Sequence, residues 1–273
     1  MDRKSESRKS ILITGGTSGL GLELVHLFLE RGFDVVTTGR QQVEIHGFSG
    51  SFFPYKVDFS DLKQVAITAR AIAETHKLSY IINNAGVLSP PEYIETVDGL
   101  EYTFQVNFIS HLLINEIILT GMKESSPVRI AAITSPVYRF TGSDPFSQTG
   151  QDDYNAMRAY SSSKRYLVIM CGFLSSKYNK QVLQCFSFDP GTFSSGIYRM
   201  QRSWFRTMYH LASPFMRKPS VVAKLLEGLM LKEVIVNGMI YSGLKQSRKM
   251  PVEDPEKTNA FFRSCYDLIR PYC

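Results

Sequence analysis

A strand, a glycine-rich turn and a helix follow one another near the start of this chain, and this order constrains the fold more than any other feature. Ser10 to Thr14 form an apolar run typical of a buried strand, which leads directly into the turn Gly15-Gly16-Thr17-Ser18-Gly19-Leu20-Gly21. The apolar-rich segment Leu22 to Leu29 then predicts a helix that stops at Arg31-Gly32. In such a turn the glycines let backbone amides approach a pyrophosphate, and the helix N-terminus adds a positive dipole end. The sequence therefore predicts a dinucleotide-binding unit with the spacing Thr-Gly-x-x-x-Gly-x-Gly.

Strand-like and helix-like segments alternate along the rest of the 273 residues. This alternation predicts an α/β fold, with a doubly wound parallel sheet (a Rossmann fold) between two helical layers. The hydrophobic content of 44% is enough for a substantial core. No repeat or linker divides the chain, so we expect one domain over residues 10–273 behind a flexible arm at residues 1–9. The arm has no apolar segment typical of a secretory signal, and no run of about 18 apolar residues predicts a membrane span.

Charge and cysteine usage narrow the class of partner. The net charge of +6 is modest and not gathered into a tract, which favours an anionic cofactor and disfavours nucleic acid. The four cysteines, Cys171, Cys185, Cys265 and Cys273, show no Cys-x-x-Cys spacing, so we expect no metal site and a cytoplasmic location. His111 lies on an apolar helix and is expected to be structural.

The second strand predicts which cofactor is bound. It runs from Phe33 to Thr38 and ends in Gly39-Arg40. An NAD site usually has an acid here for the ribose 2′-hydroxyl, whereas an arginine suits a 2′-phosphate. Because positions 37–40 contain no Asp or Glu, NADP(H) is favoured over NAD(H). The alternative is that Arg40 is only a solvated residue after a strand.

Tyr160 and Lys164 are the candidate catalytic pair. Four residues apart on a helix, they project from the same face about one turn apart. A phenol has a pKa of about 10, and a nearby ammonium favours the phenolate, which makes Tyr160 a usable proton donor or acceptor. Ser135 can supply a hydrogen bond to a carbonyl oxygen. The pattern is common by chance, and it gains weight from the cofactor turn that precedes it.

Taken together, these residues resemble the short-chain dehydrogenase/reductase family over nearly the whole chain. The resemblance implies that Asp58 contacts the adenine ring and that the hydroxyl of Ser195 forms a hydrogen bond with the cofactor amide. It also implies that Pro190-Gly191 closes over the nicotinamide. The cofactor-binding residues implied in this way are Gly15, Thr17, Ser18, Gly19, Leu20, Gly21, Arg40, Asp58, Asn84, Ala85, Gly86, Tyr160, Lys164, Pro190, Gly191 and Ser195.

The same resemblance implies a catalytic tetrad of Asn107, Ser135, Tyr160 and Lys164. Lys164 is implied to hold the nicotinamide ribose, and Asn107 to position a water that passes protons to Lys164. Ser135 and Tyr160 are separated by 24 residues, and this insertion resembles the one in retinol-dehydrogenase-like, NADP-dependent members. Two positions depart from the family pattern: Phe193 is bulky, and Pro136 restricts Ser135 to extended backbone.

Two later segments bear on the substrate. The first is a substrate-loop region at about residues 192–220, in which apolar residues recur at helical intervals between basic ones. It is either an amphipathic helix on the core, a lid over a lipophilic substrate, or a membrane-surface contact. The second is a helical tail at about residues 254–270, with Asp254 as N-cap and Pro255 in the first turn. We expect the tail to pack near the substrate mouth or at a subunit interface.

The sequence as a whole predicts an NADP(H)-dependent oxidoreductase that interconverts a carbonyl and an alcohol on a fairly apolar small molecule. Tyr160 would be the general acid and base. A homodimer or a homotetramer is compatible with the resemblance. Three alternatives stay open: a catalytically silent NADP(H) sensor or scaffold, a biosynthetic reductase for a specialised ketone or enoyl group, and a sugar-nucleotide epimerase or dehydratase. The glycine spacing disfavours the last of these.

Overall fold

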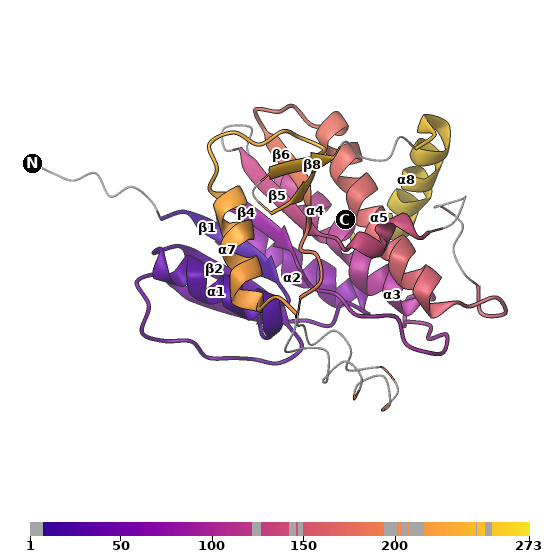
Figure 1. Ribbon diagram of the computed structural model, residues 1–273, viewed down its shortest axis with the longest axis horizontal. Helices are drawn as coiled ribbons and strands as arrows, with labels where there is room; N and C mark the ends of the chain where they lie inside the picture. The colour runs from indigo at the N-terminus through magenta and orange to yellow at the C-terminus, as the bar shows by residue number, and fades with distance from the viewer. Residues whose placement is uncertain are drawn as a thin grey trace, which may run out of the picture.

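A computed structural model describes residues 8–121, 127–141, 146, 150–193, 201, 203, 207, 216–243, 245–248 and 253–273. Within these residues, eight strands form one sheet in the order β3-β2-β1-β4-β5-β6-β7-β8 (Figure 1). Strands β1 to β7 are parallel to their neighbours, and β8 is antiparallel to β7. The α/β prediction is therefore confirmed, whereas the antiparallel edge strand was not predicted. The strands are β1 Ser10–Thr14, β2 Asp34–Gly39, β3 Phe52–Lys56, β4 Leu78–Asn83, β5 Val128–Ile133, β6 Leu183–Asp189, β7 Ile240–Ser242 and β8 Lys245–Arg248.

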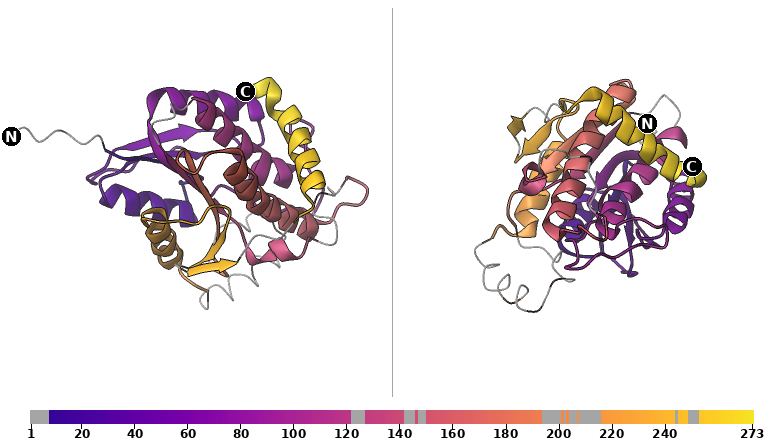
Figure 2. Two further views of the ribbon diagram at one scale, coloured as in Figure 1. Left: turned by 90° about the horizontal axis from the view of Figure 1, so that it is seen from above. Right: turned by 90° about the vertical axis from the view of Figure 1, so that its right-hand side faces the viewer.

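Helices cover both faces of the sheet, as Figure 2 shows. Helices α1 and α7 pack together on one face, and α2, α4 and α5 lie on the other. Side chains alternate along each buried strand, so Leu12 enters one core while Ile11 and Ile13 enter the other. The helices are α1 Gly19–Glu30, α2 Leu62–Thr75, α3 Tyr102–Phe104, α4 Ser110–Gly121, α5 Ala156–Lys177, α7 Pro219–Met230 and α8 Pro255–Ile269. Three shorter segments accompany them: the π-helix Gln105–Ile109 and the 3₁₀ turns Pro136–Arg139 and Arg270–Tyr272.

The strand order reverses between β1 and β4, which are neighbours in the sheet although β2 and β3 separate them in sequence. In doubly wound sheets, ligands bind beyond the carboxyl ends of the strands at such a reversal. The glycine turn that follows β1 and the Asn84-Ala85-Gly86 segment that follows β4 therefore leave the sheet side by side. The fold thus predicts the place of the site before any side chain is considered.

The C-terminal helix α8 lies across the outer side of α5 (Figure 2). The carboxylate of Asp254 caps it by accepting the amides of Glu256 and Lys257 at 2.8 and 3.2 Å, which confirms the predicted start. Phe262 is buried and stacks on Phe173 of α5, with ring centroids 4.0 Å apart. The apolar face of α8 therefore packs on the core of the same chain, and the expected place of the tail near the substrate mouth or at a subunit interface stays a prediction.

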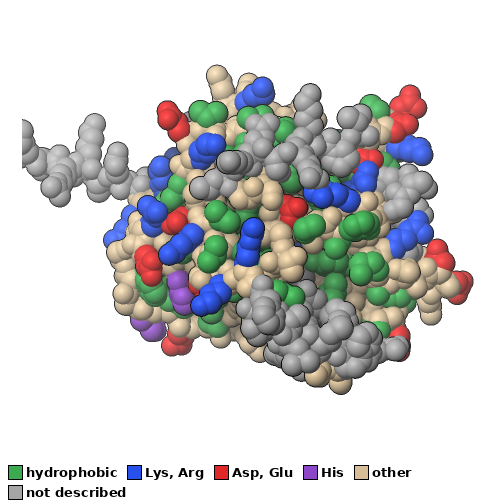
Figure 3. Space-filling model, viewed as in Figure 1, with side chains coloured by type: hydrophobic (Ala, Val, Ile, Leu, Met, Phe, Trp, Pro, Cys, Tyr) green, Lys and Arg blue, Asp and Glu red, His purple; other side chains and the backbone are tan. Residues whose placement is uncertain are grey.

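Most of the predicted substrate-loop region, including the segment 208–215, lies outside the described residues. The described helices include none with the length and apolar character required to cross a bilayer. On the face shown in Figure 3, Lys and Arg side chains of the described residues are interspersed with hydrophobic and acidic ones.

Candidate active site

A cleft of about 580 Å³ opens at the carboxyl ends of the central strands. Nearly all of the site residues predicted from the sequence line it. Asn107 is fully buried behind the cleft wall, and Ser195 lies outside the described residues. The predicted residues that line the cleft are Gly15, Thr17, Ser18, Gly19, Leu20, Gly21, Arg40, Asp58, Asn84, Ala85, Gly86, Ser135, Tyr160, Lys164, Pro190 and Gly191.

The glycine turn forms one end of the cleft. Gly15 has a φ of +67°, a conformation that favours glycine, and its amide donates to the Thr38 carbonyl at 2.8 Å. A Cβ atom on Gly21 would lie 2.3 Å from the Gly15 carbonyl oxygen, so only glycine fits there. Ser18 precedes α1 without capping it through its side chain, and the first turn of α1 contains no acidic residue. The amides at the start of α1 are therefore suited to an anionic group such as a pyrophosphate.

Arg40 and Asp58 lie beyond this turn, after β2 and β3. Asp58 accepts hydrogen bonds through Oδ1 from the amide and the hydroxyl of Ser60, at 3.0 and 2.8 Å. Tyr102 joins them in lining the cleft. Burial raises the pKa of Tyr102. The charge of Arg40 lowers this pKa and the charge of Asp58 raises it, so the phenol lies within electrostatic reach of both side chains. No pattern in the sequence indicates Tyr102, because it stands at the start of a helix of only three residues.

Tyr160 and Lys164 face the cleft from α5, one helical turn apart. The ammonium of Lys164 lies 5.9 Å from the centroid of the Tyr160 ring. Lys164 is 4% exposed, and its Nζ donates to the Ile133 carbonyl at 3.1 Å. Burial lowers the pKa of Lys164 to about 8. The hydroxyl of Thr134 donates to the Lys164 carbonyl at 2.9 Å, which ties the end of β5 to α5.

Ser135 reaches the same wall from the end of β5. Its backbone is extended, with φ −158° and ψ 151°, as expected for a residue that precedes proline. Pro136 then begins the 3₁₀ turn Pro136–Arg139. The strand end and the helix α5 together place Ser135, Tyr160 and Lys164 around one part of the cleft.

Asn107 lies in the middle of the π-helix Gln105–Ile109, a kind of segment found frequently at functional sites. Its side chain is engaged in holding the backbone. Oδ1 accepts the Val87 amide at 2.8 Å, and Nδ2 donates to the Val87 carbonyl at 2.9 Å and to Ser163 Oγ at 3.0 Å. Ser163 Oγ in turn donates to the Tyr160 carbonyl at 2.8 Å. The Asn107 side chain thus joins the exit of β4 to α5 behind the cleft.

His111 is fully buried one turn further along this helical stretch. The structural role expected for it stays a prediction, and its contacts are polar: Nδ1 lies 2.9 Å from the Asn107 carbonyl oxygen, and Nε2 lies 2.9 Å from Thr14 Oγ1. Burial lowers the pKa of His111 to about 3; the hydrogen bond to Asn107 opposes this shift, and the charge of Lys164 adds to it. The imidazole is therefore neutral. The sequence feature that could have indicated these contacts is the position of His111, four residues after Asn107.

Apolar side chains line part of the cleft. Val87, Val137, Met157 and Phe193 are among them. Met157 lies on α5 one turn before Tyr160, and the residue is 60% exposed. No pattern in the sequence indicates Met157 as a cleft residue, since a single methionine one turn before Tyr160 is not part of a motif.

The loop that carries Pro190 and Gly191 borders the cleft after β6. Gly191 has a φ of +68°, and its amide donates to Asp189 Oδ1 at 2.9 Å. Asp189 is buried, and Arg139 lies 3.9 Å from its Oδ2, which links this loop to the turn after Ser135.

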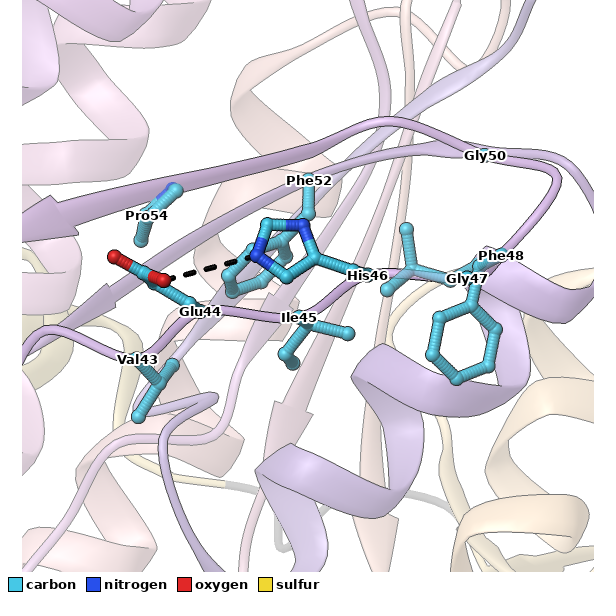
Figure 4. Close-up of a pocket in the computed structure, with 10 residues that line it drawn as sticks. Val43, Glu44, Ile45, His46, Gly47, Phe48, Gly50, Phe52 and Pro54 are labelled. Atoms are coloured by element: carbon cyan, nitrogen blue, oxygen red, sulfur yellow. Dashed lines mark ion pairs between the residues drawn. The ribbon is translucent and has the colours of Figure 1, made fainter.

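A second cavity of about 500 Å³ lies between the loop 43–50 and the edge strand β3 (Figure 4). The side chains of Glu44 and His46 are 3.7 Å apart there and more than four-fifths exposed. The remaining residues that line the cavity are apolar or glycine. This cavity lacks a set of buried polar groups that could perform chemistry. Among the described residues, no three His, Cys, Asp or Glu side chains gather to hold a metal ion.

Comparison with known proteins agrees with this geometry. The model of the family described as short chain dehydrogenase matches residues 9–205. Retinol dehydrogenase 11 of Homo sapiens is 30% identical over 246 residues, which cover 81% of this chain and 74% of that protein. Retinol dehydrogenase 12 of Mus musculus is 30% identical over 223 residues, which cover 78% and 70%.

Two solved structures have the same fold. A short-chain dehydrogenase from Sphingobium yanoikuyae in complex with NADPH is similar with a TM-score of 0.66 and 17% identity, over 96% of this chain and 95% of that one. A 3-oxoacyl-[acyl-carrier protein] reductase from Brucella melitensis in complex with NAD is similar with a TM-score of 0.67 and 21% identity, over 87% and 96%.

Proposed function

The chain belongs to the short-chain dehydrogenase family and is an oxidoreductase that acts on alcohol or carbonyl groups, and from this premise we propose that it is an NADP(H)-dependent carbonyl reductase or alcohol dehydrogenase for apolar small molecules. One observation carries the proposal. Ser135, Tyr160 and Lys164 lie around the same cleft as the glycine turn, although the segments that bear them are far apart in sequence. A protein that only senses a nucleotide has no need of this second group of residues.

The proposed mechanism divides the work between cofactor and protein. When bound, the nicotinamide supplies or accepts the hydride. In the reductive direction, Tyr160 protonates the substrate oxygen while Ser135 donates a hydrogen bond to the same oxygen. The positive charge of Lys164 favours the phenolate of Tyr160 and so makes the proton easier to give up. In the oxidative direction, Tyr160 takes the proton instead.

The residues of the cleft fit a dinucleotide. The amides at the start of α1 would hold the pyrophosphate, and Asp58 would meet the adenine. Arg40 supports the choice of NADP(H), since it is exposed at the end of β2 and no carboxylate occupies positions 37–40. Lys164 would hold the ribose next to the nicotinamide.

An apolar substrate is supported by Val137, Met157 and Phe193, which are apolar and line the same cleft as Tyr160. An apolar wall with few polar groups binds a ligand chiefly by removing its surface from water. The names of two relatives refer to retinol, which points to the same class. We propose a lipophilic aldehyde or ketone, or the corresponding alcohol, with one oxygen at the Ser135–Tyr160 end.

The test is the consumption of NADPH with aldehydes and ketones of increasing apolar size, repeated with NADH. We expect turnover that rises with apolar size and prefers NADPH. Binding of NADPH without turnover on an extensive panel, in a folded protein, would contradict the proposal and favour a cofactor-sensing role.

A further inference from the structure

A chain of buried hydrogen bonds begins at the glycine turn and runs behind the cleft. Thr14, the residue before Gly15, accepts the amides of Asn84 and Ala85 at its Oγ1, at 2.8 and 2.9 Å. The same Oγ1 lies 2.9 Å from Nε2 of His111. Thr14 and His111 are both fully buried, so water does not compete for these bonds.

The partners of His111 determine which of its nitrogens carries the proton. Nδ1 faces the Asn107 carbonyl oxygen at 2.9 Å, and a carbonyl can only accept, so Nδ1 must be protonated. A neutral imidazole then accepts at Nε2, and the Thr14 hydroxyl donates to it. With this direction, Thr14 Oγ1 accepts two amides, and its one proton goes to Nε2 at 2.9 Å, which is closer than the other acceptor within reach, the Ile82 carbonyl oxygen at 3.3 Å. A cationic imidazole would carry a proton on Nε2 as well. Thr14 Oγ1 could not accept a hydrogen bond from it, because both of its acceptor positions are already used by the two amides.

The chain continues from Asn107 to the catalytic helix. The Asn107 amide donates to Ser163 Oγ at 3.0 Å, and Ser163 Oγ donates to the Tyr160 carbonyl at 2.8 Å. The bonds of Val87 to Asn107 fix which atom of that amide is the nitrogen. The backbone carbonyl of Asn107 therefore accepts a hydrogen bond from His111. The side chain of the same residue is hydrogen-bonded to α5, the helix that carries Tyr160.

From this connection we propose that His111 is a positioning residue. It fixes the position of the Asn107 peptide relative to the glycine turn, and so fixes the position of Tyr160 relative to the bound cofactor. The inference rests on the proposed function. The imidazole suits this task because it is rigid and presents one donor and one acceptor about opposite each other. A side chain that only filled space would need neither nitrogen. The ring of Phe59 packs edge-on against the imidazole, with ring centroids 5.3 Å apart, and limits its rotation.

Substitutions of His111 separate positioning from packing. His111→Phe keeps a planar ring and removes both bonds, whereas His111→Asn retains a donor near the position of Nδ1. We expect His111→Phe to lower kcat about tenfold to a hundredfold, because small misplacements of catalytic groups have effects of this size. We expect the KM for substrate to change little and His111→Asn to recover part of the loss.

Two further variants provide the controls. Thr14→Val removes the link to His111 together with the acceptor of the Asn84 and Ala85 amides, so we expect adding His111→Phe to Thr14→Val to lower kcat no further. Ile118→Ala destabilises the same helix α4 from a buried position outside the hydrogen-bond chain, and we expect its kcat to stay at the wild-type value. A wild-type kcat in folded His111→Phe overturns the proposal, as does a loss in Ile118→Ala equal to that in His111→Phe.

A measurement without turnover keeps the link testable by itself. In ¹⁵N-labelled protein free of cofactor, NMR reports which imidazole nitrogen carries the proton, and the spectrum of His111→Phe assigns the signal. We expect the Nδ1–H form at neutral pH and a change at Nε2 in Thr14→Val. The Nε2–H form or a cationic ring overturns the proposal. If the wild-type protein proves inactive on every substrate, the proposed function fails, and the tautomer still decides for or against the link between Thr14 and His111.

Discussion

Arg165 of α5 and Glu253, just before α8, form an ion pair in which Arg165 Nε lies 2.7 Å from Glu253 Oε1. Both side chains are mostly buried, at 15% and 11% exposed. Arg165 also donates through Nη1 to Thr141 Oγ1 at 3.1 Å. Because Arg165 follows Lys164 directly, this pair anchors the C-terminal helix beside the candidate catalytic residues.

Glu253→Gln should therefore destabilise the protein. It removes the charge but keeps the size, and leaves the guanidinium of Arg165 without its counter-charge in a largely buried position. We expect a loss of about 2 kcal/mol in the free energy of unfolding, between the values typical of exposed and of fully buried pairs. Urea unfolding measures the loss. Asp267→Asn is the matched control, since Asp267 pairs with Arg270 on the exposed side of α8, and it should cost less than about 0.5 kcal/mol. Equal losses in the two variants would refute the anchoring role.

Tyr160→Phe should abolish most of the turnover and leave cofactor binding nearly intact. The substitution removes the proposed proton donor and changes the shape of the cleft little. We expect kcat to fall about a hundredfold to ten-thousandfold, the usual range for loss of general acid–base catalysis. Steady-state kinetics and NADPH fluorescence titration report the two effects separately. Met157→Leu, one turn earlier on α5, serves as the control for a change in the cleft wall. Near-normal turnover in Tyr160→Phe would mean that another group transfers the proton.

Arg40→Glu should reverse the preference between cofactors. The variant replaces the residue proposed to meet the 2′-phosphate with an acid that can accept hydrogen bonds from a 2′-hydroxyl. We expect kcat/KM for NADPH to fall about tenfold to a hundredfold, the value of one or two charge-assisted hydrogen bonds, while kcat/KM for NADH rises. Arg263→Glu makes the same change in net charge on the exposed side of α8 and should leave the preference as it is. An unchanged ratio in Arg40→Glu would show that Arg40 is only a solvated residue.

His111 should make the folded state sensitive to acid. Burial lowers its pKa to about 3, against an ordinary value of 6.5. Between these two values the unfolded chain binds a proton that the folded chain does not, so stability is full above pH 6.5 and falls as the pH drops toward 3. The loss amounts to at most about 4 to 5 kcal/mol.

The comparison that tests this pH dependence is between the wild-type protein and His111→Phe. Urea unfolding of both proteins at a series of pH values should show a shallower decline for the variant, since it lacks the titrating group. Parallel curves over the same interval would show that His111 is protonated in the folded state as readily as in the unfolded chain.

The sequence alone was sufficient wherever a pattern of neighbouring residues decides the structure. The alternation and apolar runs predicted β1 at Ser10–Thr14, and the Asp254-Pro255 pair predicted the start of α8. The helix after the glycine turn was predicted from Leu22, whereas α1 begins at Gly19, because the last turn glycines already belong to the helix. The family resemblance brought in the site residues, and the fold gathers those it describes at one cleft and its wall.

Only the tertiary structure decided which residues far apart in the chain contact each other. His111 and Thr14 are 97 positions apart, and Asn107 and Ser163 are 56 apart. The place of α8 on α5 and the entry of Met157 into the cleft wall are of the same kind. Local patterns record which side of a helix or strand is apolar, since that depends on its period of 3.6 or 2 residues. Which two polar groups meet in the interior depends on how the layers pack, and a buried donor and its acceptor need no regular spacing in the sequence.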